Sequence, residues 1–118
     1  MKKKCLIILI VICLISCDET LEFSLIGKKV TLLAPVNNLN TTDSVHTFYW
    51  EKLNGAVQYQ LQIVSPRFDS IVRLVDDTII TNNTFHTELD KGTYQWRVKA
   101  LNNSTQSDNS DIWNLKIH

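Results

Sequence analysis

The sequence predicts an all-β domain, a seven-stranded antiparallel sandwich, and three observations lead to that prediction. From Val30 onward, apolar and polar residues alternate in short runs, which is the pattern of half-buried strands. β-branched and aromatic residues dominate these runs. Clusters rich in Asn, Asp and Gly separate them. Two antiparallel sheets that face each other would bury the apolar side of every strand.

Residues 1–16 are predicted to be a signal peptide rather than part of the fold. Three lysines follow Met1, and an unbroken apolar run then extends from Cys5 to Ile15. A helix needs about 20 apolar residues to span a bilayer core, so this run is too short for a transmembrane anchor. A basic flank before a short apolar core is typical of secretory signals.

The end of this segment, Leu14-Ile15-Ser16-Cys17, resembles the lipobox of bacterial lipoproteins. The resemblance implies cleavage after Ser16, a diacylglycerol on Cys17 and acylation of the new amine, and several chains together anchor a protein stably. The alternative is an ordinary signal peptide with a chance cysteine. The three cysteines are residues 5, 13 and 17, so the following domain has no disulfide, no cysteine-ligated metal and no cysteine nucleophile.

The leader Asp18-Glu19-Thr20-Leu21-Glu22 resembles the acidic stretch that surface lipoproteins of Bacteroidetes carry after the lipid-bearing cysteine. The resemblance implies anchoring to the outer membrane with the domain exposed at the surface. A periplasmic-facing location is the alternative, because an aspartate after the cysteine also resembles an inner-membrane retention signal of enterobacteria. Residues 17–29 are predicted to be a lipid-anchored tether.

The domain is predicted to cover residues 30–118. Its strands are expected at 30–34, 46–51, 57–65, 70–77, 84–89, 92–101 and 111–117. The fourth run is ambiguous, because Phe68, Ile71 and Val75 also fit a helical stripe. Its β-branched residues and its short length favour a strand.

Alternation also predicts the inner face of each strand. In the third run Tyr59 and Leu61 point one way, and the glutamines between them point the other way. The residues predicted to be buried are Trp50, Tyr59, Leu61, Tyr94, Trp96, Val98 and Trp113.

Three motifs together resemble a fibronectin type III domain, an immunoglobulin-like sandwich, in the version found in Bacteroidetes lipoproteins. They are Trp50, the run Gly55-Ala56-x-x-Tyr59-x-Leu61-Gln62-Ile63, and Leu89-x-x-Gly92-x-Tyr94-x-Trp96-Arg97-Val98-Lys99-Ala100-x-Asn102. Leu89 with Tyr94 resembles the tyrosine corner, in which the phenol bonds back to the backbone. The fold hosts many roles, so the resemblance implies a structure and leaves the function open.

Asn54-Gly55 is a point at which two principles disagree. Asn-Gly between strands is the strongest short-range signal for a hairpin. The fibronectin-like topology instead sends the chain from one sheet to the other between Trp50 and Tyr59. We predict the sheet switch, because it lets the two apolar faces oppose each other across the core.

Composition and motifs argue against several classes of function. The chain has 12 basic and 12 acidic residues, a net charge of zero, so no strong field recruits nucleic acid. No nucleophile elbow or Gly-rich turn positions a catalytic serine. His86 and Glu88 share a strand face, but two ligands do not make a metal site. We predict a protein that is not an enzyme, with no cofactor and no metal.

The outward side of the third and sixth strands is the candidate binding face. Its residues are Gln58, Gln60, Gln62, Gln95, Arg97 and Lys99. We predict a surface binding or adhesion module, attached to the membrane by its lipid, whose ligand is an unknown protein or glycan. The alternative is a structural or accessory spacer subunit of an envelope complex, with this face merely solvated.

Three tripeptides resemble the Asp-Ser/Thr-apolar O-glycosylation motif of exported Bacteroidetes proteins. They begin at Asp43, Asp69 and Asp77. The resemblance implies modification at Ser44, Ser70 and Thr78.

Overall fold

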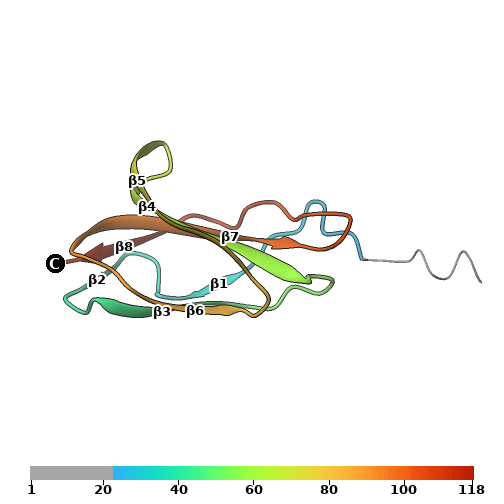
Figure 1. Ribbon diagram of the computed structural model, residues 1–118, viewed down its shortest axis with the longest axis horizontal. Helices are drawn as coiled ribbons and strands as arrows, with labels where there is room; N and C mark the ends of the chain where they lie inside the picture. Colours follow the sequence, from blue (N-terminus) through green and yellow to red (C-terminus); the bar gives the residue numbers. More distant parts are fainter. Residues whose placement is uncertain (1–22) are drawn as a thin grey trace, which may run out of the picture.

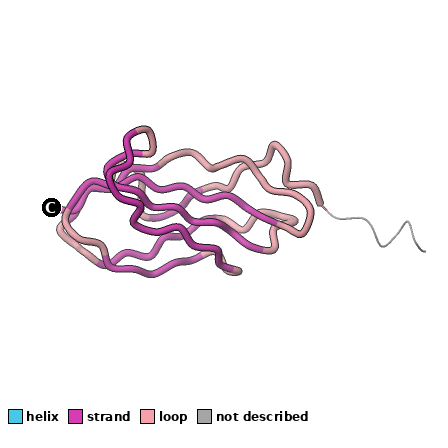
Figure 2. The backbone as a smooth tube through the Cα atoms, turned by 45° about the horizontal axis from the view of Figure 1, so that its top comes forward, coloured by secondary structure: helices cyan, strands magenta, loops and turns pink. Residues whose placement is uncertain are grey.

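The computed structural model describes residues 23–118, which form two β-sheets packed face to face (Figures 1 and 2). One sheet has three strands in the order β1-β3-β6, and the other has five in the order β2-β8-β7-β4-β5. The strands are β1 (Leu32–Ala34), β2 (Leu39–Thr41), β3 (Val45–Trp50), β4 (Gln58–Arg67), β5 (Ser70–Ile80), β6 (Thr84–Glu88), β7 (Gly92–Leu101) and β8 (Trp113–Ile117). The predicted all-β sandwich is confirmed. No helix that could cross a membrane occurs in these residues.

Every predicted run forms a strand, including the ambiguous one, which is β5. The predicted number of strands is wrong by one, because β2 lies between the first two predicted strands, in a stretch with turn-forming residues. This short strand pairs in parallel with β8, with Leu39 opposite Leu115 and Thr41 opposite Ile117. Asn38, directly before β2, has φ +64°, a conformation that asparagine tolerates better than most residues.

The chain changes sheets between β3 and β4, as predicted for the segment around Asn54-Gly55. Gly55 has φ +92°, whereas Asn54 is not in the positive-φ region, so the two-residue hairpin turn does not form. The backbone N–H of Ala56 donates to the Leu53 carbonyl at 3.0 Å, and the Leu53 N–H donates to the Tyr59 hydroxyl at 3.0 Å. These bonds close the corner between the sheets.

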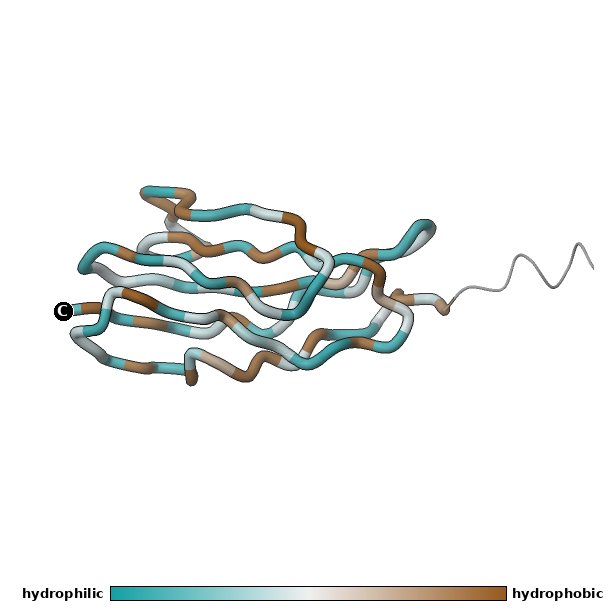
Figure 3. Tube along the Cα trace, turned by 60° about the horizontal axis from the view of Figure 1, so that its bottom comes forward, coloured by the Kyte–Doolittle hydropathy of each residue, from teal (hydrophilic) through white to brown (hydrophobic). Residues whose placement is uncertain are grey.

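The core lies between the sheets, and the alternation of apolar and polar residues along the strands is visible in Figure 3. Trp96 is fully buried at the centre of this core. Its ring centroid lies 4.9 Å from that of Phe48 and 5.9 Å from that of Trp113. Of the residues predicted to be buried, all are buried except Trp113, which is half-buried. The Tyr94 hydroxyl donates to the Asp90 carbonyl at 2.5 Å, which confirms the tyrosine corner.

Part of the predicted tether belongs to the domain. Leu25 is fully buried, and its backbone N–H donates to the Thr105 hydroxyl at 3.0 Å. The Lys28 carbonyl accepts from the Asp108 N–H at 2.9 Å. The packed chain therefore begins before residue 30, the predicted start of the domain. Among residues 23–118, the buried hydrophobic residues extend from Leu25 to Ile117, and they form one hydrophobic core.

Candidate functional site

The predicted binding residues gather on the outer face of the five-stranded sheet. In the ladder between β4 and β7, Gln60 lies opposite Lys99, and Gln62 lies opposite Arg97. Gln95 continues the same face one step further, and Gln58 is exposed at the other end. We call this surface the polar face.

Hydrogen bonds join the polar face to the edge strand β5. The Arg97 Nε donates to Gln62 Oε1 at 2.9 Å. Gln60 Nε2 donates to Asp77 Oδ1 at 2.8 Å, and Gln62 Nε2 donates to Asp77 Oδ2 at 3.5 Å. The Arg97 guanidinium also lies 4.1 Å from the centre of the Phe68 ring, a cation–π contact. These contacts hold Arg97 in one orientation.

A second branch of the network crosses β7 and β8. The Gln95 Oε1 accepts from the Phe68 backbone N–H at 2.9 Å, and its Nε2 donates to Asn114 Oδ1 at 2.9 Å. The Asn37 side-chain oxygen accepts from the Asn114 N–H at 2.8 Å. Phe68, Asn37 and Asn114 are not among the predicted binding residues, because their place in this network depends on tertiary contacts.

A hollow of about 230 Å³ adjoins this branch, where β2, β8 and β7 lie side by side. Its lining residues are Asn38, Leu39, Asn40, Thr93, Asn114, Leu115 and Lys116. Five of these residues carry amide, hydroxyl or ammonium groups, and Leu39 and Leu115 add apolar surface, so the lining is mixed. The unpredicted strand β2 forms one side of it.

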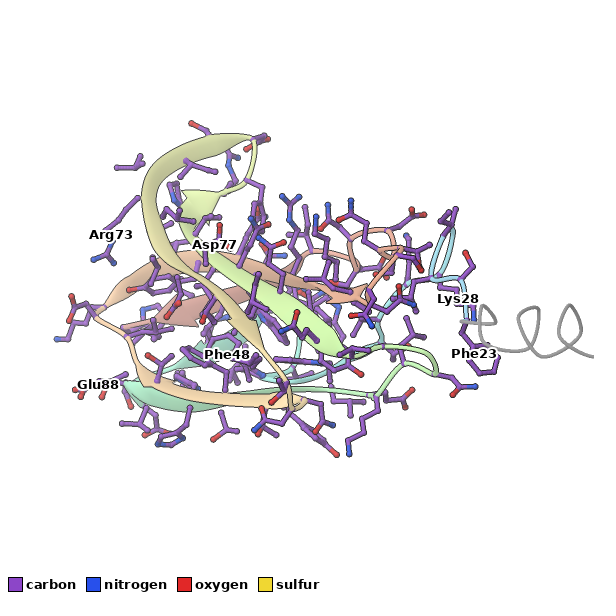
Figure 4. The ribbon with its side chains drawn as sticks, turned by 45° about the vertical axis from the view of Figure 1, so that its right-hand side comes forward. Phe23, Lys28, Phe48, Arg73, Asp77 and Glu88 are labelled. Atoms are coloured by element: carbon purple, nitrogen blue, oxygen red, sulfur yellow. The ribbon has the colours of Figure 1, made fainter. Side chains whose placement is uncertain are left out.

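The β4–β5 hairpin rises above the polar face (Figures 1 and 4). The pairing of its strands is irregular at Ile63/Val64 and again at Ser65/Pro66, and such bulges bend a strand. Val64 lies on the polar side of β4 in the alternation and yet is fully buried, because the hairpin bends over this face.

The apolar residues at the end of this hairpin remain exposed instead of entering the core. Val72 is 84% exposed, and Ile71 and Leu74 are about half exposed. β5 is an edge of its sheet. Exposed apolar stretches of this kind are typical of surfaces that contact other molecules.

The inner part of β5 carries a carboxylate that works against extension of the sheet. Asp76 lies opposite the core residue Ile63. Burial raises the pKa of the Asp76 carboxyl, a hydrogen bond from the Asp77 backbone lowers it, and the neighbouring Asp77 charge raises it further. Inward-pointing charges are one device that keeps an edge strand from pairing with a further strand. Most of the exposed large apolar residues of β5 lie at the hairpin end, and Ile79 in the inner part is exposed as well.

The other candidate residues are spread over the molecule. Ser70 is exposed at the start of β5, whereas Ser44 and Thr78 are half-buried, so Ser70 is the most accessible of the predicted modification sites. His86 Nδ1 lies 2.8 Å from the Thr47 hydroxyl. Within residues 23–118 no three His, Cys, Asp or Glu residues come together as metal ligands. Cys17 lies outside the described residues.

No protein-family model matches the sequence, and no curated protein matches it. Among solved structures, the chain is similar to the fibronectin type III domain of human fibronectin type III domain containing protein 3. The TM-score is 0.54 at 14% identity, over 81% of this chain and 90% of that one. A second structure, described as FN3tt mut, has a TM-score of 0.44 at 15% identity, over 74% of this chain and 83% of that one. The first likeness, with the strand order and the tyrosine corner, shows that the chain has the fibronectin type III fold.

Proposed function

We propose that the chain is a lipid-anchored, non-catalytic binding module of a bacterial cell envelope. Cys17 carries the anchor, the outer membrane holds it, and the domain faces the cell exterior. The polar face recognises the ligand, a protein or a glycan. The lipobox Leu14–Cys17 and the acidic leader Asp18–Glu22 support the anchor and the location.

The observation that carries the binding role is the network around Arg97. Its guanidinium is fixed by Gln62 and Phe68 before any ligand arrives, so little side-chain entropy is lost on binding. Lys99 lies on the same face two residues further along β7, and the nearby hollow offers amide groups. The projecting hairpin flanks this surface on one side (Figure 4).

Replacing two cations of the polar face is expected to weaken ligand binding. In the variant Arg97→Gln/Lys99→Gln, binding of envelope protein and glycan fractions should fall at least about tenfold, because a hydrogen bond to a charged group contributes about 1.5–3 kcal/mol. Titration of the immobilised chain 17–118 measures this. Lys52→Gln/Lys91→Gln removes the same charge at exposed positions outside the face and should bind normally. Equal binding by both variants would rule out the polar face.

The variant Cys17→Ala is expected to lose its membrane attachment, because the thioether can no longer form. The precursor should stay uncleaved or be released, and fractionation of envelopes with mass spectrometry of the N-terminus distinguishes these states. Protease treatment of intact cells then reports whether the wild-type domain faces outward. Normal processing and membrane recovery of the variant would contradict the anchor.

A structural or accessory spacer is the second candidate, and the exposed hairpin end favours it. Ile71, Val72 and Leu74 offer apolar area of the kind found in stable assembly contacts. A spacer would keep its partners when Arg97 and Lys99 are replaced and would lose them in Val72→Ser/Leu74→Ser.

A further inference from the structure

The end of the sandwich at which the described chain begins exposes two large apolar side chains. Phe23 is 60% exposed and Ile26 is 73% exposed. Phe23 and Lys28 lie together at this end (Figure 4), and the C-terminus lies at the opposite end (Figure 1). We call Phe23, Ile26 and Lys28 the N-terminal tip.

A tight turn presents Ile26. The Lys28 N–H donates to the Leu25 carbonyl at 3.0 Å, and Gly27 has φ +79°, the pattern of a type II turn with glycine in its third position. Ile26 occupies the second position, where the side chain points away from the domain. Buried Leu25 fixes the start of this turn, so the isoleucine projects from a rigid support.

Phe23 is also held in place while its ring stays exposed. The Asn102 side-chain amide donates to the Phe23 carbonyl at 2.7 Å and to the Gly55 carbonyl at 3.2 Å. A Cβ added at Gly55 would lie 2.6 Å from the Phe23 Cβ, so glycine permits this close packing. The Lys28 ammonium lies 5.7 Å from the ring centre. Phenylalanine is one of the residues that interfacial segments bury at the boundary between headgroups and acyl chains, and lysines there reach toward water.

We propose that the N-terminal tip docks on the lipid surface that carries the anchor, with Phe23 and Ile26 in the boundary between headgroups and acyl chains. The proposal rests on lipidation of Cys17. Residues 18–22 can span at most about 18 Å when fully extended, so an anchored domain keeps its tip next to the bilayer. Even weak apolar contacts then form at a high effective concentration.

The docking needs apolar insertion rather than attraction to anionic lipid. Lys29, next to the tip, pairs with Asp111 at 3.3 Å, and the leader brings its own acids. Neutral phosphatidylcholine vesicles are therefore the proper probe.

The cysteine inventory permits a direct test. The chain 17–118 contains a single cysteine, Cys17, which couples to a maleimide lipid in phosphatidylcholine vesicles and reproduces an anchor at that position. Hydrogen exchange of the backbone over residues 23–29 should slow several-fold on coupling. In Phe23→Ser/Ile26→Ser, whose replaced side chains are exposed, coupling should leave the exchange rate unchanged. Val72→Ser/Leu74→Ser, altered at the hairpin, should keep the protection.

A matched control attaches the opposite end to the membrane. In Cys17→Ser/His118→Cys the coupling site lies at the C-terminus, and residues 23–29 should exchange as in free protein. Unchanged exchange after coupling through Cys17, or equal protection from either end, would overturn the docking. Protection that requires added envelope protein would overturn it as well and assign the tip to a protein partner. Membrane release of Cys17→Ala is a separate readout, so anchoring and docking can fail independently.

Discussion

Truncating Trp96 to alanine is expected to lower the free energy of unfolding by about 3–5 kcal/mol, the range for a large buried aromatic side chain. Trp96 is fully buried and contacts the rings of Phe48 and Trp113 edge to face. The cavity left by the indole would lie between the two sheets. For a domain with a typical stability of about 5–15 kcal/mol, this is a large loss, and urea denaturation measures it.

The variant Trp96→Phe distinguishes the effect of aromatic packing from that of the indole N–H, because it keeps an aromatic ring and removes the N–H. The Trp96 Nε1 is buried and finds no acceptor among residues 23–118, so removing this N–H sacrifices no hydrogen bond. We expect Trp96→Phe to be clearly less destabilising than Trp96→Ala. If both variants unfolded at the same urea concentration, the assignment of the stabilisation to packing of this ring would be wrong.

Truncating Leu25 to alanine is expected to cost about 2–5 kcal/mol, although the residue lies in a segment that the sequence assigned to a tether. Its side chain is fully buried in the core cluster. A true tether residue would change stability by less than about 0.5 kcal/mol. The midpoint of urea or thermal unfolding of the chain 17–118 distinguishes these outcomes.

The neighbouring residue provides the control for Leu25. Ile26 has the same side-chain size and is largely exposed, so Ile26→Ala should leave the midpoint almost unchanged. Similar small shifts for both variants would show that residues 23–29 do not pack on the sandwich in solution.

The strand pattern could be predicted because side-chain alternation is a local property. Tyr59, Leu61, Tyr94 and Trp96 show their inward direction within single runs. The polar face follows from the same alternation, which is why its six residues were found together. The sheet switch at Asn54-Gly55 required the global argument that two apolar faces must meet.

Other features depend on contacts between distant segments. β2 has Leu39 as its single apolar residue and exists through parallel pairing with β8. Asp77 and Phe68 join the polar face only because β5 neighbours β4 and because two bulges bend the hairpin back. The burial of Leu25 could not be predicted, because a single leucine outside an alternating run shows no hydrophobic periodicity.

The burial of Leu25 limits the distance that a lipid-anchored domain can move from the membrane. A free tether over residues 18–29 would reach about 43 Å, whereas residues 18–22 alone reach about 18 Å. With the proposed anchor at Cys17, the shorter tether would confine the domain to a volume roughly one-fourteenth as large, in proportion to the cube of its reach. A domain anchored in this way would meet molecules of the same membrane often and would not reach those on a distant surface. Inserting residues into the tether 18–22, without any change to the sandwich, would increase the distance that the domain can reach.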